Sequence, residues 1–308
     1  MAFTVPGDLQ KRLRGVQIIM VTPFDEQRRV SIGMVRELTR YLIDRGIREG
    51  RGVLVTQGSM SECFSVDMEE RRKIVQAIVE EAGREVPVVV GCNATDTRTV
   101  IQLCQSAQQA GADGVMVMPP YYFTPSNEEI LEFYRSLTES IDIGVVLYNN
   151  VQVCVDIDLE VLRELAAMEK IVALKDCTAD FTKFKICAGA LADKLTLLNG
   201  GGPLWEPQAT LAGARGFYTL AGNFAPESAL QLWEACEQGD YQKAEDLSRQ
   251  FVLYIRFMRE ARKSIQLTKM IMRDLGLPGG FERPPLLPLS AAEEGMVSKV
   301  KKQMGLGA

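Results

Sequence analysis

A lysine at the end of a short apolar segment is the residue of this sequence best suited to covalent chemistry. Residues 171–174 read as a strand buried on both faces, and Lys175 follows directly, ahead of Asp176 and Cys177. Burial disfavours the charged ammonium form and lowers the pKa of a lysine. A neutral lysine amine attacks carbonyl groups and forms a Schiff base. Taken alone, a lysine that reaches solvent or pairs with a loop carboxylate is the commoner arrangement.

The chain contains no histidine, which narrows the chemistry available to it. Ser-His-Asp sites, Cys-His sites and histidine-ligated metals are excluded. Proton transfer must rely on Lys, Tyr, Asp, Glu, Cys or hydroxyl side chains, and a carbonyl lyase would use a lysine iminium as its electron sink. The seven cysteines form no Cys-x-x-Cys pair. We therefore expect no metal, no cofactor, and free thiols in a reducing compartment.

The composition is that of an ordinary globular chain of 308 residues, of which 46% are apolar and 24% charged. A net charge of -5 gives no electrostatic reason to expect a nucleic-acid or anionic-membrane partner. The amino terminus lacks a signal-peptide pattern, and no apolar run reaches the length of a membrane span. These features predict a cytoplasmic protein whose partner is a small molecule.

The elements that must position the lysine alternate between strand and helix along most of the chain. The expected strands are residues 16–21, 52–56, 86–92, 114–118, 143–148, 171–174, 195–198 and 216–220. The expected helices are residues 31–44, 68–82, 96–110, a helix opening at Ser126, and residues 159–168, 181–191, 205–212 and 226–237. Eight such units predict an α/β fold of the (β/α)8 TIM-barrel type over residues 1–240. No Gly-x-Gly-x-x-Gly follows the first strand, which disfavours a dinucleotide-binding sheet.

The remaining residues, 241–308, read as a C-terminal helical extension. Its helices are expected at residues 242–260, 264–275 and 290–304, and a connector rich in proline and glycine separates the last two. No flexible linker divides this extension from the barrel, so we expect its helices to pack on the barrel.

Polar residues gather at the predicted carboxyl ends of the strands, where barrel enzymes carry their active sites. The second strand is followed by Gly58-Ser59-Met60-Ser61-Glu62, and the fourth by Tyr121 and Tyr122. The fifth ends in Tyr148-Asn149, the sixth in Lys175, and the seventh in Asn199 with three glycines. Tyrosines, a hydroxyl group and a lysine on one rim would form a proton relay without histidine.

These segments resemble the dihydrodipicolinate synthase / N-acetylneuraminate lyase family of class I, Schiff-base, aldolase-like enzymes. The Gly-Thr-Thr-Gly-Glu loop of that family corresponds to residues 58–62, and its Pro-Tyr-Tyr-x-x-Pro-Ser segment to residues 120–126. Its Tyr-Asn pair is Tyr148-Asn149, and its Schiff-base lysine is Lys175. The four matches occur in order, each at a strand end, and the likeness covers nearly the whole chain.

The resemblance implies a role for each matching residue. Lys175 would condense with pyruvate or a longer 2-oxo acid, and Tyr148 would act beside it as general acid and base. Ser59 would link Tyr148 to Tyr122, which in the family reaches the site of a neighbouring subunit. The backbone N–H groups of Ser59 and Met60 would hold the substrate carboxylate. The residues further expected to bind or line the substrate are Gly58, Asn150, Asn199 and Gly200.

Departures from the family pattern fall where a second substrate would bind. Met60 replaces a threonine, and Ser61 replaces a glycine for which we expect a special backbone angle. The arginine that follows Tyr-Asn in true dihydrodipicolinate synthases is missing from residues 150–154, and the segment after the seventh strand is Asn-Gly-Gly-Gly. Glu62 is expected to fasten its loop rather than to touch substrate.

These departures predict an aldolase or dehydratase acting on another 2-oxo acid, such as a sugar-acid derivative. The alternatives are dihydrodipicolinate synthase itself, a barrel that binds a 2-oxo acid without turning it over, and a phosphate-binding barrel isomerase. The resemblance also implies a homo-oligomer, either a dimer or a dimer of dimers (a homotetramer), with Tyr122 shared across an interface.

Overall fold

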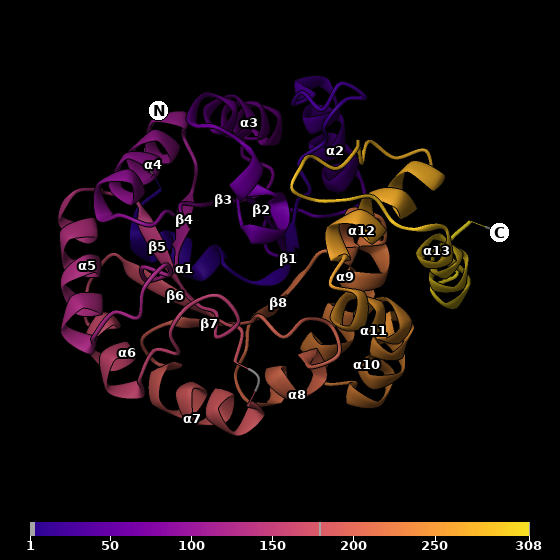
Figure 1. Ribbon diagram of the computed structural model, residues 1–308. Coiled ribbons are helices and arrows are strands. Elements are labelled where there is room, and N and C mark those ends of the chain that lie inside the picture. Colours follow the sequence, from indigo (N-terminus) through magenta and orange to yellow (C-terminus); the bar gives the residue numbers. More distant parts are fainter. Residues whose placement is uncertain (1–3, 179, 308) are drawn as a thin grey trace.

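The computed structural model of the protein describes residues 4–178 and 180–307. Eight parallel strands close into a barrel in the order in which they occur in the chain, because the eighth strand pairs with the first. Helices surround the barrel, as seen down its axis in Figure 1. The predicted (β/α)8 fold with a C-terminal helical part is confirmed.

The strands are β1 (Gly15–Ile19), β2 (Gly52–Thr56), β3 (Val88–Gly91), β4 (Gly114–Val117), β5 (Gly144–Asn149), β6 (Ile171–Asp176), β7 (Thr196–Asn199) and β8 (Gly216–Thr219). The helices of the barrel are α1 (Pro6–Arg12), α2 (Ile32–Asp44), α3 (Met68–Ala82), α4 (Thr97–Ala110), α5 (Asn127–Glu139), α6 (Leu159–Leu165), α7 (Phe181–Leu191), α8 (Glu206–Leu211) and α9 (Pro226–Glu237). The C-terminal helices are α10 (Tyr241–Ser248), α11 (Val252–Ala261), α12 (Ser264–Asp274) and α13 (Ala291–Gln303). The division predicted between residues 240 and 241 falls at the start of α10 and stays a prediction.

Local sequence signals explain several helix ends. The Ser126 hydroxyl accepts a hydrogen bond from the Glu129 backbone N–H, and the Glu129 carboxylate accepts one from the Ser126 N–H. These two bonds form a capping box at the start of α5, the helix predicted to open at Ser126. Gly111 ends α4 in the left-handed conformation, with φ of 87°.

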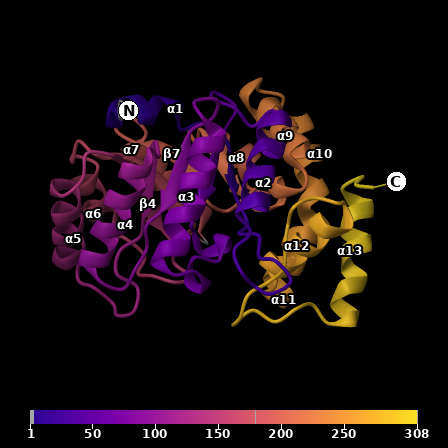
Figure 2. The same cartoon turned by 90° about the horizontal axis from the view of Figure 1, so that it is seen from above.

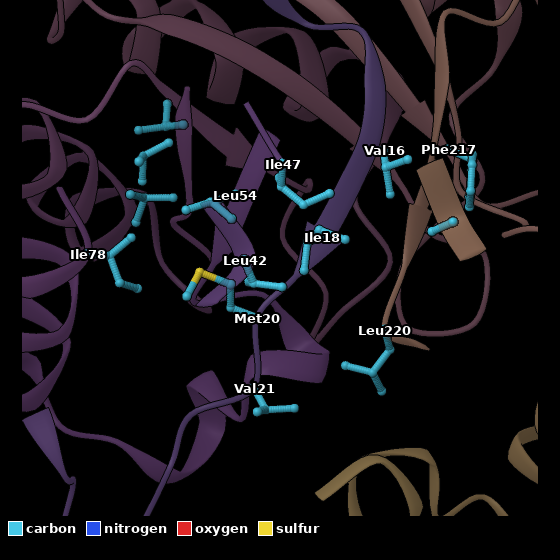
Figure 3. Packing of buried hydrophobic residues seen from close by; sticks show 14 of the residues in the cluster. Val16, Ile18, Met20, Val21, Leu42, Ile47, Leu54, Ile78, Phe217 and Leu220 are labelled. Atoms are coloured by element: carbon cyan, nitrogen blue, oxygen red, sulfur yellow. The ribbon is translucent and has the colours of Figure 1, made fainter. Parts of the chain in front are cut away.

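Apolar side chains pack on both faces of the sheet. One cluster lies between the strands and the surrounding helices and includes Ile18, Leu54 and Ile78, shown in Figure 3. A second cluster fills the barrel interior with alternate residues of the strands, such as Val53 and Val55. Successive side chains of a strand point to opposite faces, so one strand supplies both clusters.

Helix α1 closes the amino-terminal end of the barrel and was not predicted from the sequence. Its Leu9 is fully buried with the interior cluster. A Cβ atom on Gly114 or Gly144 would lie 2.5 or 2.8 Å from Leu9 Cδ2. The glycines that begin β4 and β5 therefore make room for this plug, and Figure 2 shows α1 at one end of the barrel.

The helix predicted over residues 242–260 is wrong as a single element. The chain forms α10, a 3-10 turn at Arg249–Phe251 (η4), and then α11. Helix α10 packs on α8 and α9, whereas α11 packs on α12 and α13. The turn, which buries Phe251, redirects the chain between these two surfaces. Within the described residues, no helix is long and apolar enough to cross a membrane.

Candidate active site

Lys175 lies in the barrel interior near the carboxyl end of β6, beside Tyr148 of β5. Its side chain is only 4% exposed. Across residues 4–178 and 180–307, no carboxylate oxygen lies within 4 Å of its amine. The amine nitrogen instead lies 3.9 Å from the centre of the Tyr148 ring and 4.1 Å from that of Tyr218. Burial lowers the pKa of Lys175, opposed by the nearby Cys177 thiol. A solvent-exposed or carboxylate-paired lysine is thus excluded.

The neighbouring carboxylate of Asp176 faces away from this amine. Its Oδ1 accepts hydrogen bonds from Asn149 Nδ2 at 3.0 Å and from the Thr178 backbone N–H at 2.9 Å. Adjacent residues of a strand point to opposite faces, so Asp176 fastens the ends of β5 and β6 from outside the barrel interior. The amine is left without a counter-charge.

Tyr148 is held by a residue other than the one predicted. Its hydroxyl accepts a hydrogen bond from Asn150 Nδ2 at 2.8 Å, and the other end of that amide accepts one from the Gln152 backbone N–H. In the described part of the chain, Ser59 makes no hydrogen bond to Tyr148. Burial is the main cause that raises the pKa of Tyr148 well above its usual value, so the phenol keeps its proton. Asn150 thus bonds directly to the Tyr148 hydroxyl, and the substrate contact expected of Asn150 stays a prediction.

The Gly58–Glu62 loop forms a short 3-10 turn at Ser59–Ser61 (η1) after β2. Backbone N–H groups of Ser61 and Cys63 both bond to the Gly58 carbonyl. Among the described residues, the N–H groups of Ser59 and Met60 have no backbone partner, as is usual at the start of a helical turn. They remain available to a carboxylate. The special backbone angle expected at Ser61 falls instead on Glu62, with φ of 59°, because that residue ends the turn.

Helix α12 braces this loop through a buried ion pair between Lys269 and Glu62. Both side chains are fully buried. Lys269 Nζ also donates hydrogen bonds to the carbonyl oxygens of Thr22 at 2.7 Å and Phe281 at 2.8 Å. Burial raises the pKa of Glu62 and lowers that of Lys269 to about 8. The prediction that Glu62 fastens its loop is confirmed by these contacts.

The Asn199 side chain bonds to the loop after β7 and to α8, and the substrate contact expected of it stays a prediction. Its Nδ2 donates to the Gly202 carbonyl and to Glu206 Oε2, both at 3.0 Å, and its Oδ1 accepts from the Gly201 N–H. We therefore assign Asn199 to the shape of the loop after β7. A Cβ atom on Gly200 would lie 2.3 Å from the Cys177 sulfur, so glycine is needed where the loop passes this thiol.

Tyr122 projects into solvent from the loop after β4, with 86% of its surface exposed. Its neighbour Phe123 is 52% exposed. Within the described chain, Tyr122 makes no hydrogen bond to Ser59 or Tyr148. Its predicted place across a subunit interface stays a prediction.

Tyr218 was missed by sequence reasoning. It follows Phe217 in β8, and both residues are buried. Two adjacent aromatic residues of a strand face opposite sides, and the sequence carries no signal for which of them points inward. In the closed barrel Tyr218 points inward and packs in the interior cluster, whereas Phe217 packs in the outer cluster.

A (β/α)8 barrel with an unpaired, buried lysine at the carboxyl end of a strand defines a class I, lysine-dependent barrel. Residues 12–304 match the Dihydrodipicolinate synthetase family. The chain belongs to this family, whose members are class I lyases.

Individual relatives agree with this assignment. A 4-hydroxy-tetrahydrodipicolinate synthase of Hyphomonas neptunium is 31% identical over 291 residues, which cover 93% of this chain and 97% of the relative. A dihydrodipicolinate synthase structure from Bacillus anthracis superposes with a TM-score of 0.87 at 28% identity, covering 94% of this chain and 97% of that chain. One from Oceanobacillus iheyensis gives a TM-score of 0.89 at 25% identity, covering 97% and 99%.

Proposed function

We propose that the protein is a Schiff-base-forming aldolase or dehydratase that acts on pyruvate or a longer 2-oxo acid. The observation that carries this proposal is the Lys175 amine, which is buried without a carboxylate between two tyrosine rings. An amine in these surroundings is more readily neutral, and the neutral form is the nucleophile. A structural ion pair would need a counter-charge here.

The chain's own residues supply the remaining functions. The Lys175 nitrogen forms the bond to the ketone carbon. The free N–H groups of Ser59 and Met60 bind the 2-oxo acid carboxylate. The Gly58 carbonyl stabilises this turn by accepting hydrogen bonds from the N–H groups of Ser61 and Cys63. Tyr148, held by Asn150, gives and takes the proton when the carbon–carbon or carbon–oxygen bond is made or broken.

A second substrate different from that of the named synthases is supported by the turn after β5. Residues 150–154 contain no arginine or lysine. The Cys154 thiol of this turn instead contacts the carbonyl oxygens of Pro119 and Pro120. A site without a cation here does not favour a second carboxylate, so we infer a neutral partner or leaving group, as in a sugar-acid derivative.

We also propose that the active form is a homo-oligomer in the cytoplasm. The exposed Tyr122 and Phe123 support a subunit contact at the loop after β4. Among the described residues every cysteine is a free thiol, which suits a reducing compartment. Nothing in the net charge of -5 favours a nucleic-acid partner.

The test is borohydride trapping across a panel of 2-oxo acids, followed by measurement of the intact mass. We expect one reduced adduct per chain with pyruvate and with the physiological substrate, and turnover with the latter. Lys185→Met, at an exposed lysine of α7, is the control and should trap normally. Absence of any adduct would sink the lyase proposal, and an adduct without turnover would favour a binding protein.

A further inference from the structure

A second tyrosine, Tyr218, packs its ring beside the Lys175 amine. Tyr148 belongs to β5, which pairs with the lysine strand β6 on one side. Tyr218 belongs to β8, which lies on the other side of β6, beyond β7. The Lys175 amine is within 3.9 and 4.1 Å of the two ring centres. Tyr218 is 2% exposed, so its whole side chain lies inside the barrel. The amine that would bond to substrate is therefore flanked by both rings.

The two hydroxyl groups differ in their partners. Four tyrosines of the described chain are buried, and three of them have a hydroxyl partner. Tyr134 donates to the Val117 carbonyl at 2.8 Å, Tyr254 bonds to Thr268 at 2.7 Å, and Tyr148 accepts from Asn150. The Tyr218 hydroxyl is buried without a protein partner among the described residues. Buried polar groups are nearly always bonded, so a buried hydroxyl without a protein partner inside the barrel is free to bond to water, a ligand or a reacting group.

We propose that Tyr218 is a second catalytic tyrosine, whose hydroxyl contacts the oxygen on the ketone carbon while the Schiff base forms. This inference rests on the proposed function and adds a residue to it. Tyr148 then serves the later step, in which the bond to the second reactant is made or broken. Because the two tyrosines come from different strands, their hydroxyl groups can act on different atoms of the bound substrate.

Schiff-base formation moves protons among the Lys175 nitrogen, the substrate oxygen and the Tyr218 hydroxyl. The Lys175 lone pair bonds to the ketone carbon, and the carbonyl π electrons move to oxygen, which takes a proton from nitrogen to give a carbinolamine. The nitrogen lone pair then forms the C=N bond, and the oxygen leaves as water with the phenolic proton of Tyr218. The products are the iminium cation, water and a phenolate. The phenolate next takes a proton from the adjacent carbon, which restores the phenol and gives the neutral enamine.

The surroundings suit a donor that is ionised only transiently. Burial raises the pKa of the Tyr218 phenol, with a smaller contribution from Cys177, so it carries its proton when substrate arrives. The phenolate forms only next to the new iminium cation, whose charge stabilises it.

The test compares Tyr218→Phe with the wild type in two pyruvate assays, the rate of borohydride-trapped adduct formation and the exchange of methyl protons with deuterium oxide. Tyr218→Phe keeps the ring and removes the hydroxyl. We expect both rates to fall about 100-fold, the scale of one general acid–base group. Tyr134→Phe, which removes a buried hydroxyl outside the barrel, is the matched control and should retain both rates. Wild-type rates in Tyr218→Phe would overturn the inference.

Other outcomes also separate the two proposals. If the wild type itself forms no adduct, the proposed function fails, whereas wild-type trapping with an unaffected Tyr218→Phe variant rejects Tyr218 alone. If Tyr218→Phe does not fold, a crystal structure of the reduced wild-type pyruvate adduct decides. We expect the Tyr218 hydroxyl within about 3.5 Å of the former ketone carbon or its neighbour. A hydroxyl more than about 5 Å from both would reject the inference.

Discussion

The lowered pKa of the Lys175 amine follows from its burial without a carboxylate partner. The nearest carboxylate, that of Asp176, is turned outward and bonded to Asn149 and Thr178. Two aromatic faces attract a cation only weakly compared with a carboxylate, whereas full burial costs the cation its hydration. Burial therefore wins, and the pKa of Lys175 lies below its ordinary value of 10.5.

This balance predicts how Schiff-base formation depends on pH. The amine attacks only when neutral, so the rate of trapping with pyruvate should rise with pH and level off above the pKa of Lys175. Because burial lowers that pKa, the inflection should lie below 10.5. Initial trapping rates measured from about pH 6 to about pH 11 would locate this inflection. An inflection at or above 10.5 would contradict a desolvated amine.

The hydrogen bond from Asn150 to Tyr148 makes a separate prediction. Asn150→Ala frees the phenol to rotate, and we expect turnover of the physiological substrate to fall about 10-fold, the equivalent of one hydrogen bond of about 1.4 kcal/mol. The KM should change little, because Ser59 and Met60 still bind the carboxylate. Gln152→Ala, at an exposed position of the same turn, serves as control. A change confined to KM would instead return Asn150 to substrate binding.

At the residue scale the sequence was informative about chemistry and less so about contacts. Lys175 and Tyr148 could be selected because each follows an apolar strand. Asn150 and Asn199 sit at equivalent-looking strand ends, yet one amide turns to Tyr148 and the other to the loop after β7. Side-chain direction at a strand end depends on the turn that follows, which single-residue types do not encode. Tyr218 was missed for another reason, because the sequence does not show which of the adjacent Phe217 and Tyr218 points into the barrel.

Among the elements, α12 has the largest influence on the site beyond the strands. It contributes Lys269 to the buried pair with Glu62 and a hydroxyl, that of Ser264, which donates to the Met60 sulfur at 3.3 Å. The Thr22 hydroxyl adds a bond to the Ser61 carbonyl at 2.6 Å. The loop that carries the N–H groups of Ser59 and Met60 is therefore held by the C-terminal helix α12 and by the segment that follows β1.

Breaking this pair should cost stability and substrate affinity together. Lys269→Met leaves the Glu62 carboxylate buried and unpaired, and we expect a loss of about 3–5 kcal/mol in the free energy of unfolding and a raised KM for the 2-oxo acid. Denaturant unfolding and steady-state kinetics measure the two effects. Combining Lys269→Met with Glu62→Gln should recover part of the stability.

The controls for this prediction lie on the surface. Arg256→Ala breaks an exposed i,i+4 ion pair with Glu260 and should alter neither quantity appreciably. If Lys269→Met unfolds at the wild-type denaturant concentration, the buried pair does not brace the loop.

Strands and helices with a sustained apolar pattern could be predicted from the sequence more reliably than short elements and turns. Eight strand–helix units could be recognised because each strand is an apolar run and each long helix carries caps such as Ser126. Helix α1 has seven residues and a single fully buried one, Leu9, so it lacked a period to detect. The break at η4 was missed because Phe251 continues the apolar pattern while the chain changes direction.

For the whole molecule, the exposed loop after β4 bears on the oligomeric state. Tyr122 and Phe123 are exposed apolar side chains next to the site, as expected of a surface that a second copy covers. We predict a solution mass of two or four chains by analytical ultracentrifugation. Tyr122→Ala should lower turnover at least 10-fold while adduct formation with pyruvate persists, on the scale of a lost proton-relay group. A monomer with full activity would remove Tyr122 from the relay.

The barrel as a whole brings the candidate residues together from positions far apart in the chain. Residues 59, 148, 175 and 218 come from β2, β5, β6 and β8 or the loops that follow them, and only closure of the sheet places them around one amine. The family and the barrel could therefore be predicted from ordered motifs, whereas the tyrosine pair required the three-dimensional arrangement.

Peptide mapping after borohydride reduction with pyruvate would show whether Lys175 is the residue that bonds to substrate, as we propose. We predict that the added mass lies on the peptide that contains Lys175 and that Lys175→Met forms no adduct. A label on any other lysine, or undiminished labelling of Lys175→Met, would contradict it.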